Sequence, residues 1–176
     1  MVAKVLQVDV VVAGGSLSAV AAALAVARAN PDVQILLTEP TDWLGGQATS
    51  QGVSAPDNAW HEPARTLMRD NRALYYPADY NQFIQAIKAA PKAAPGEGYG
   101  GEECNWVSRE AFDPRTAAWV LDDMVAPYEN LHLLKMTVVK DVASAELDGS
   151  RRVTGLRLIQ RFAKPGYTQF SNCLLY

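Results

Sequence analysis

Cysteine is scarce in this sequence. The chain holds two cysteines among its 176 residues, Cys104 and Cys173, and they lie far apart with no spacing typical of a metal site. So little cysteine excludes a disulfide-rich scaffold and a cysteine-ligated metal centre, and no metal site is predicted. A reduced, cytoplasmic setting is therefore the expectation.

Long hydrophobic runs and an excess of positive charge are also missing. No apolar run approaches the ~18 residues that a membrane-spanning helix needs, so no membrane partner is expected. Residues 1–8 hold one lysine and lead straight into an apolar stretch, which is unlike a secretory signal peptide. The formal net charge of −3 gives no reason to expect nucleic acid as a partner. With 49% hydrophobic residues, the chain suits one globular domain over residues 1–176.

The most informative stretch covers residues 9–39. An apolar run meets the glycine pair Gly14 and Gly15, a small-residue pattern typical of a helix follows, and a second apolar run leads to the acid Glu39. The predicted elements are a strand at 10–13, a helix at about 16–29 and a strand at 33–37. The order strand, tight turn, helix, strand and acid is typical of the first βαβ unit of a dinucleotide-binding fold.

Each part of this unit has a physical role in holding a dinucleotide. Gly14 allows the chain to turn sharply off the first strand. The helix N-terminus offers free N–H groups and the positive end of its dipole, which suit a pyrophosphate. The Glu39 carboxylate can accept hydrogen bonds from ribose hydroxyls. In G-x-G-x-x-G register Gly14 takes the first position, Ser16 the second and Ala19 the third, so Ser16 is the departure from the pattern.

A glycine-rich loop follows the acid directly. It reads PTDWLGGQATSQG, and its paired glycines Gly45 and Gly46 let backbone N–H groups approach a ligand closely. Trp43 and Leu44 are expected to pin the loop to the domain. A flexible loop without a ligand is the alternative, and the position of the loop immediately after a ribose-type acid argues against it.

The strings AGGSLSAVAAALAVARA and LLTEPTDWLGGQATSQG together resemble the N-terminus of FAD-dependent oxidoreductases of the glutathione-reductase-like superfamily. The resemblance covers about residues 8–160. It implies an α/β, Rossmann-like FAD/NAD(P)-binding domain with a parallel sheet, flanking helices and a β-meander. It also implies FAD as the cofactor, with the second Gly-Gly element lying along the flavin. The cofactor-binding residues that it implies are Gly14, Gly15, Ser16, Leu17, Ser18, Ala19, Glu39, Pro40, Gly45, Gly46, Gln47 and Val139.

Residues 53–108 form a predicted insertion of helices and loops. One helix is expected over about residues 62–72, and another over about 80–90 with Asp79 as its N-cap. The apolar stripe of the second helix consists of Phe83, Ile84 and Ile87. His61 is more typical of a surface or packing residue than of a catalytic base, because the sequence offers it no evident partner. No residue of the chain is assigned a catalytic role.

The last third of the chain predicts a capped helix, a strand and a β-hairpin. Asp113 is a strong N-cap, and Pro114 suits the first helical position. The predicted strand lies at 131–134, and the hairpin has strands at 138–147 and 153–159 around the turn Asp148-Gly149. In the resembled family a valine near the start of such a meander lies over the adenine with its backbone, and Val139 matches that position.

Three readings of the function remain open from the sequence. The first is the N-terminal FAD-binding portion of a flavin-dependent oxidoreductase whose small-molecule substrate is unassigned. The second is an NAD-binding module of a dehydrogenase, in which Glu39 selects NAD over NADP, although such a site does not need Gly45 and Gly46. The third is a truncated, non-catalytic remnant. Because the tail GYTQFSNCLLY lacks a further strand pattern, the fold is expected to be incomplete and to associate with a C-terminal half.

Overall fold

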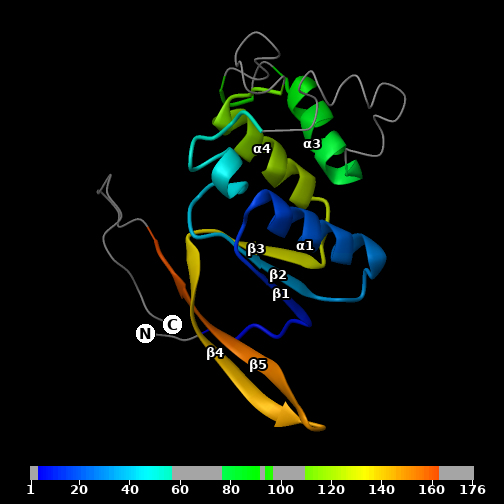
Figure 1. Ribbon diagram of the computed structural model, residues 1–176, viewed down its shortest axis with the longest axis vertical. Coiled ribbons are helices and arrows are strands. Elements are labelled where there is room, and N and C mark those ends of the chain that lie inside the picture. The colour runs from blue at the N-terminus through cyan, green and yellow to red at the C-terminus, as the bar shows by residue number, and fades with distance from the viewer. Residues whose placement is uncertain (1–3, 57–76, 92–93, 97–109, 163–176) are drawn as a thin grey trace, which may run out of the picture.

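A three-stranded parallel sheet organises the fold (Figure 1). The computed structural model describes residues 4–56, 77–91, 94–96 and 110–162. The strands are β1 (Val10–Ala13), β2 (Ile35–Thr38) and β3 (Leu131–Leu134), in the order β1-β2-β3. All four residues of β2 are buried, because this strand lies between its two neighbours and under a helix. The sheet therefore places the ends of β1, β2 and β3 side by side at one edge.

Helix α1 (Leu17–Ala29) connects β1 to β2 and packs on the sheet. Its buried residues are Val20, Ala23, Leu24 and Ala27. These positions follow the i, i+3, i+4, i+7 spacing of a helix with one apolar face. Because Ala23 is fully buried, the helix lies close to the strands beneath it.

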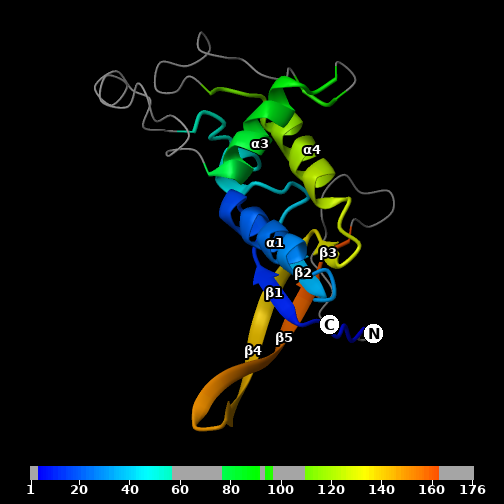
Figure 2. The same cartoon turned by 90° about the vertical axis from the view of Figure 1, so that its right-hand side faces the viewer.

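The remaining helices pack beyond α1 on the same side of the sheet (Figures 1 and 2). They are the 3₁₀ turn η1 (Gly46–Ala48), α3 (Ala78–Lys88) and α4 (Pro114–Val125). Phe83 of α3 meets Phe112, which precedes α4, edge to face with ring centroids 5.6 Å apart. The hydrophobic core thus lies between the sheet, α1 and the α3–α4 pair.

An antiparallel hairpin follows the sheet and projects away from it (Figures 1 and 2). Its strands are β4 (Thr137–Leu147) and β5 (Ser150–Gln160). The connecting residues Asp148 and Gly149 have φ values of 51° and 73°. A two-residue turn with positive φ at both positions matches the right-handed twist of paired strands. Within the described residues, this hairpin is what corresponds to the predicted meander.

Within the described residues, the predicted helices and strands are confirmed, with shifts at some of their ends. β5 begins at Ser150 rather than at residue 153, because the tight turn lets pairing start at Leu147 and Ser150. The prediction that Asp79 caps α3 is wrong. The N-cap is Pro77, and Asp79 lies in the first turn, where its carboxylate pairs with Arg28 of α1. The helix predicted over 62–72 lies outside the described residues, as does His61.

Candidate functional site

A sharp glycine turn (residues 14–16, hereafter the first glycine turn) leads from β1 into α1. Gly14 has a φ of 119°, a conformation that side-chain-bearing residues rarely adopt. Its N–H donates to the hydroxyl of Thr38 at 3.0 Å, and Thr38 is buried at the end of β2. The turn is thereby fastened to the neighbouring strand. Since a Cβ on Gly14 would meet nothing within 4 Å, backbone conformation alone is what requires glycine there.

Ser16 is the N-cap of α1. Its backbone is extended, with φ −62° and ψ 168°, and its Oγ accepts a hydrogen bond from Ala19 N at 3.3 Å. This geometry explains why the second glycine of the fingerprint is absent, because a serine fits an N-cap without strain. Leu17 and Ser18 form the first turn of the helix behind it.

The loop after β2 brings a second glycine turn (residues 45–47) against the first. Gly45 N donates to Gly15 O at 2.7 Å, and Ser16 and Gly45 form an isolated parallel bridge. Gly46 has a φ of 55°, and a Cβ placed on it would lie 3.4 Å from Ser16 Cα. Two segments far apart in the sequence are therefore paired through their backbones beside the start of α1.

The carboxylate of Glu39 lies directly behind the first glycine turn. Glu39 is 2% exposed, and its Oε1 accepts hydrogen bonds from both N and Oγ1 of Thr41, each at 2.7 Å. The other oxygen, Oε2, faces Gly15, where an added Cβ would lie only 2.2 Å away. Gly15 therefore has to lack a side chain so that Glu39 has room, whereas Ser16, at the second glycine position of the fingerprint, does not. The only sequence signal for this role is the Gly-Gly pair itself.

The remaining predicted residues lie around this arrangement. Pro40 follows Glu39, and its carbonyl accepts a hydrogen bond from Arg161 at 2.8 Å. Gln47 is exposed at the second glycine turn. Val139 lies in β4 opposite Leu158, two residues beyond Thr137, whose N–H donates to Glu39 O at 2.8 Å. Both glycine turns and Glu39 therefore lie close together, and Val139 lies in β4, which begins beside Glu39.

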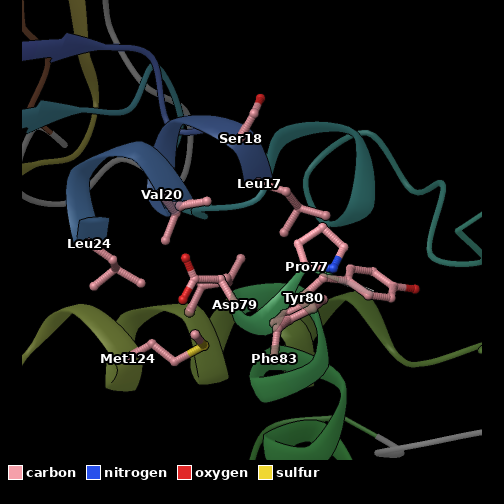
Figure 3. Close-up of a pocket in the computed structure, with 11 residues that line it drawn as sticks. Leu17, Ser18, Val20, Leu24, Pro77, Asp79, Tyr80, Phe83 and Met124 are labelled. Atoms are coloured by element: carbon pink, nitrogen blue, oxygen red, sulfur yellow. The ribbon is translucent and has the colours of Figure 1, made fainter. Parts of the chain in front are cut away.

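A separate apolar cavity of about 310 Å³ lies between α1, α3 and α4 (Figure 3). Ser18 points away from it, whereas Leu17 points toward Pro77 across it. Neither glycine turn nor Glu39 contributes to its lining. The cavity residues are Leu17, Ser18, Val20, Ala21, Leu24, Pro77, Asp79, Tyr80, Phe83, Leu121 and Met124.

Among the described residues that line this cavity, the one carboxylate, Asp79, takes part in a structural ion pair. Asp79 forms an ion pair with Arg28, which also donates from Nε to Tyr128 OH at 3.0 Å. These hydrogen bonds, to Asp79 first and to Tyr128 second, raise the pKa of Arg28. The cluster joins α1, α3 and the segment before β3.

Two kinds of feature are absent from the described ranges, a cluster of metal ligands and a membrane-spanning helix. No group of three or more histidine, cysteine, aspartate or glutamate side chains there could hold a metal ion. Among the same residues, no helix has the length and apolar character needed to cross a bilayer.

Comparison with known families is decisive for the class of protein. The profile of the family described as FAD dependent oxidoreductase matches residues 9–168. The chain belongs to this family. The match includes both glycine turns, Glu39 and the complete β4–β5 hairpin. This FAD-dependent oxidoreductase chain has the α/β fold with a parallel sheet, flanking helices and an antiparallel hairpin that its sequence predicts.

Similar solved structures are larger proteins of low sequence identity. THI4 of Thermovibrio ammonificans is 14% identical with a TM-score of 0.49, and the match covers 86% of this chain and 47% of that one. L-amino acid deaminase of Proteus myxofaciens is 14% identical with a TM-score of 0.44, covering 90% and 44%. Aklavinone-11 hydroxylase, solved with FAD and aklavinone, is 16% identical with a TM-score of 0.42, covering 93% and 31%.

The chain thus spans less than half the length of each of these three proteins. Among curated proteins, no significant match is found. The family match over residues 9–168, and not these distant likenesses, establishes the membership of the chain.

Proposed function

We propose that residues 1–176 form the N-terminal FAD-binding portion of a flavin-dependent oxidoreductase and that they hold the ADP part of FAD. The observation that carries this proposal is the meeting of two glycine turns with a buried carboxylate at the ends of β1 and β2. Such a meeting place, at the carboxyl ends of parallel strands, is where dinucleotides bind in α/β sheets.

The pyrophosphate would bind at the first glycine turn and the first turn of α1. Backbone N–H groups at a helix N-terminus, together with the positive end of the helix dipole, attract phosphate oxygens. Ser16 fits this role because its hydroxyl caps the helix and the residue is exposed. The proposed pyrophosphate residues are Gly14, Gly15, Ser16, Leu17, Ser18 and Ala19.

The adenosine ribose would bind beside Glu39. A carboxylate held at the end of β2 is a suitable acceptor for two ribose hydroxyls. Its burial fits a ligand in close contact, because a buried charge needs hydrogen-bond donors. Pro40 would border this subsite, and the backbone of Val139 would face the adenine.

The second glycine turn would run along the flavin side of the cofactor. Gly45 is buried and pairs with Gly15 through its N–H, whereas Gly46, with a φ of 55°, is partly exposed, and Gln47 adds an exposed amide. When bound, the flavin supplies the transfer of electrons or hydride, and the protein orients it.

Flavin retention tests the proposal. The purified chain is incubated with FAD, excess FAD is removed, and the visible spectrum is recorded alongside that of a Glu39→Gln variant. We expect the wild-type chain to retain flavin and the variant to raise the Kd at least about tenfold, because a charged acceptor is lost.

Asp42→Asn is the matched control, since Asp42 is an exposed acid in the same loop. Its Kd should equal that of the wild type. A folded, colourless wild-type chain with no measurable FAD affinity would show that this portion alone does not bind flavin.

NAD binding is the second candidate. FAD and NAD both contain an adenosine ribose with free hydroxyls, so the buried Glu39 suits either, whereas its carboxylate repels the 2′-phosphate of NADP. Titration with NAD and FAD in parallel distinguishes the two. Tighter binding of NAD than of FAD would support a dehydrogenase module, and binding of neither would support a non-catalytic remnant.

A further inference from the structure

Thr41 stands out among the residues around the proposed nucleotide site, because it binds the Glu39 carboxylate twice. Its N–H and its Oγ1–H both donate to Glu39 Oε1 at 2.7 Å. Within the described residues, Oε2 receives no hydrogen bond from the protein. The protein thus saturates one oxygen of the carboxylate and leaves the other, on the Gly15 side, for a ligand.

The Thr41 hydroxyl is itself held in place. Trp43 N donates to Thr41 Oγ1 at 3.1 Å, while Oγ1 also lies 3.0 Å from Trp43 O. A hydroxyl has one proton, and a carboxylate is the stronger acceptor, so the proton points to Glu39 and the lone pair receives Trp43 N–H. Met136 N donates to Thr41 O at 2.8 Å, which fastens the same residue to the start of the hairpin.

Burial makes this arrangement matter for Glu39. A glutamate side chain has three rotatable bonds, and a 2% exposed carboxylate loses most of its water. Without the hydroxyl, Oε1 would keep a single backbone donor and the carboxylate could rotate about it. A rotated carboxylate would present a different edge to the ribose.

We infer that Thr41 is a positioning residue, which orients the Glu39 carboxylate so that Oε2 accepts the ribose hydroxyls and disfavours a ribose 2′-phosphate. This inference rests on the proposed function, because it concerns the same nucleotide site. The Thr41 side chain acts through Glu39. Loss of its hydroxyl should therefore change the selectivity between a ribose with free hydroxyls and a ribose 2′-phosphate.

Thr41→Val in the full chain tests it, since valine copies the shape of threonine and keeps the backbone N–H. We expect the Kd for FAD to rise about tenfold. The Kd ratio between ADP-ribose 2′-phosphate and ADP-ribose should narrow as well, because a loosened carboxylate repels the phosphate less. A merely structural loss would weaken both ligands equally and leave this ratio unchanged.

Two further variants serve as a rescue and a control. Thr41→Ser retains the hydroxyl and should restore the FAD affinity and the ratio to wild-type values. Thr116→Val removes a buried threonine hydroxyl on α4, one that donates to Pro95 O and is not part of the proposed site, and should leave both unchanged. If Thr41→Val does not fold, Thr41→Ala removes the same hydroxyl and takes its place.

Glu39→Gln distinguishes failure of the Thr41 positioning role from failure of the proposed function. If it weakens FAD binding while the Thr41 variant matches the wild type, the positioning role is overturned and the proposed function stands. If Glu39→Gln has no effect, the ribose role of Glu39 falls and the inference falls with it. If both weaken binding, the double variant should be no weaker than Glu39→Gln alone, and full additivity would overturn the inference.

Discussion

At the scale of single residues, the site depends on two adjacent glycines for different reasons. Gly14 is needed for its φ of 119°, since an added Cβ would have open space. Gly15 is needed for space, because an added Cβ would lie 2.2 Å from Glu39 Oε2 and 2.9 Å from Leu44 Cδ2. One glycine therefore serves the backbone, and the other lets the carboxylate approach.

Substitution by alanine should separate these two needs. Gly15→Ala should displace the Glu39 carboxylate and raise the Kd for FAD at least about tenfold, as loss of a charged hydrogen bond would. Gly14→Ala should instead lower the free energy of unfolding by about 1–3 kcal/mol through backbone strain. FAD titration and urea unfolding of both variants measure the difference. Equal FAD affinity in Gly15→Ala and the wild type would contradict the close approach of Glu39.

At the scale of elements, α1 and α4 begin in the same way but in different places. Ser16 caps α1 through Ala19 N at 3.3 Å, and Asp113 caps α4 through Arg115 N at 2.8 Å. Each cap satisfies an N–H group that the helix cannot pair internally. Only the cap of α1 belongs to the first glycine turn, so only that helix start can serve the nucleotide.

The two caps form a matched pair for mutation. Ser16→Ala and Asp113→Ala should each lower the free energy of unfolding by about 1 kcal/mol. Ser16→Ala should also weaken FAD binding, because it loosens the first turn of α1, whereas Asp113→Ala should leave the Kd unchanged. Chemical unfolding and FAD titration give both quantities. A weaker Kd in the Asp113 variant alone would place the site elsewhere.

At the scale of the whole molecule, the proposed nucleotide site joins segments that are distant in the sequence. The turn after β1, the loop after β2 and the start of β4 are linked through Gly15–Gly45 and Glu39–Thr137 backbone hydrogen bonds. On the far side, Arg28 links α1 to α3. A ligand that contacts all three segments should stabilise the entire chain.

Binding linkage makes this expectation quantitative. At a free FAD concentration of 100 times the Kd, the free energy of unfolding should rise by about 2.7 kcal/mol. Urea unfolding with and without FAD measures the increase, and Gly15→Ala at the same FAD concentration is the control that should gain much less. An unchanged unfolding curve of the wild-type chain would contradict binding to the folded state.

Local sequence patterns predicted most of the helices and strands. The small-residue helix between two apolar runs predicted α1 between β1 and β2, and Asp148-Gly149 predicted the hairpin turn. Propensity, helical periodicity and turn chemistry act over a few residues, so they are legible in the sequence. Asp79 marks the limit of prediction from local sequence, because its carboxylate pairs with Arg28, 51 residues away, instead of capping α3.

The site divides in the same way. The sequence by itself determined that a glycine pair follows the first strand and that an acid ends the second strand. Glycine favours a tight turn, and a charged residue favours the polar end of a strand. Only the tertiary structure decided that Gly15 faces the carboxylate, that Ser16 serves as a cap, and that Thr41 holds Oε1. The physical reason is that strand register and loop packing determine which side chains meet, and neither is encoded within a single local segment.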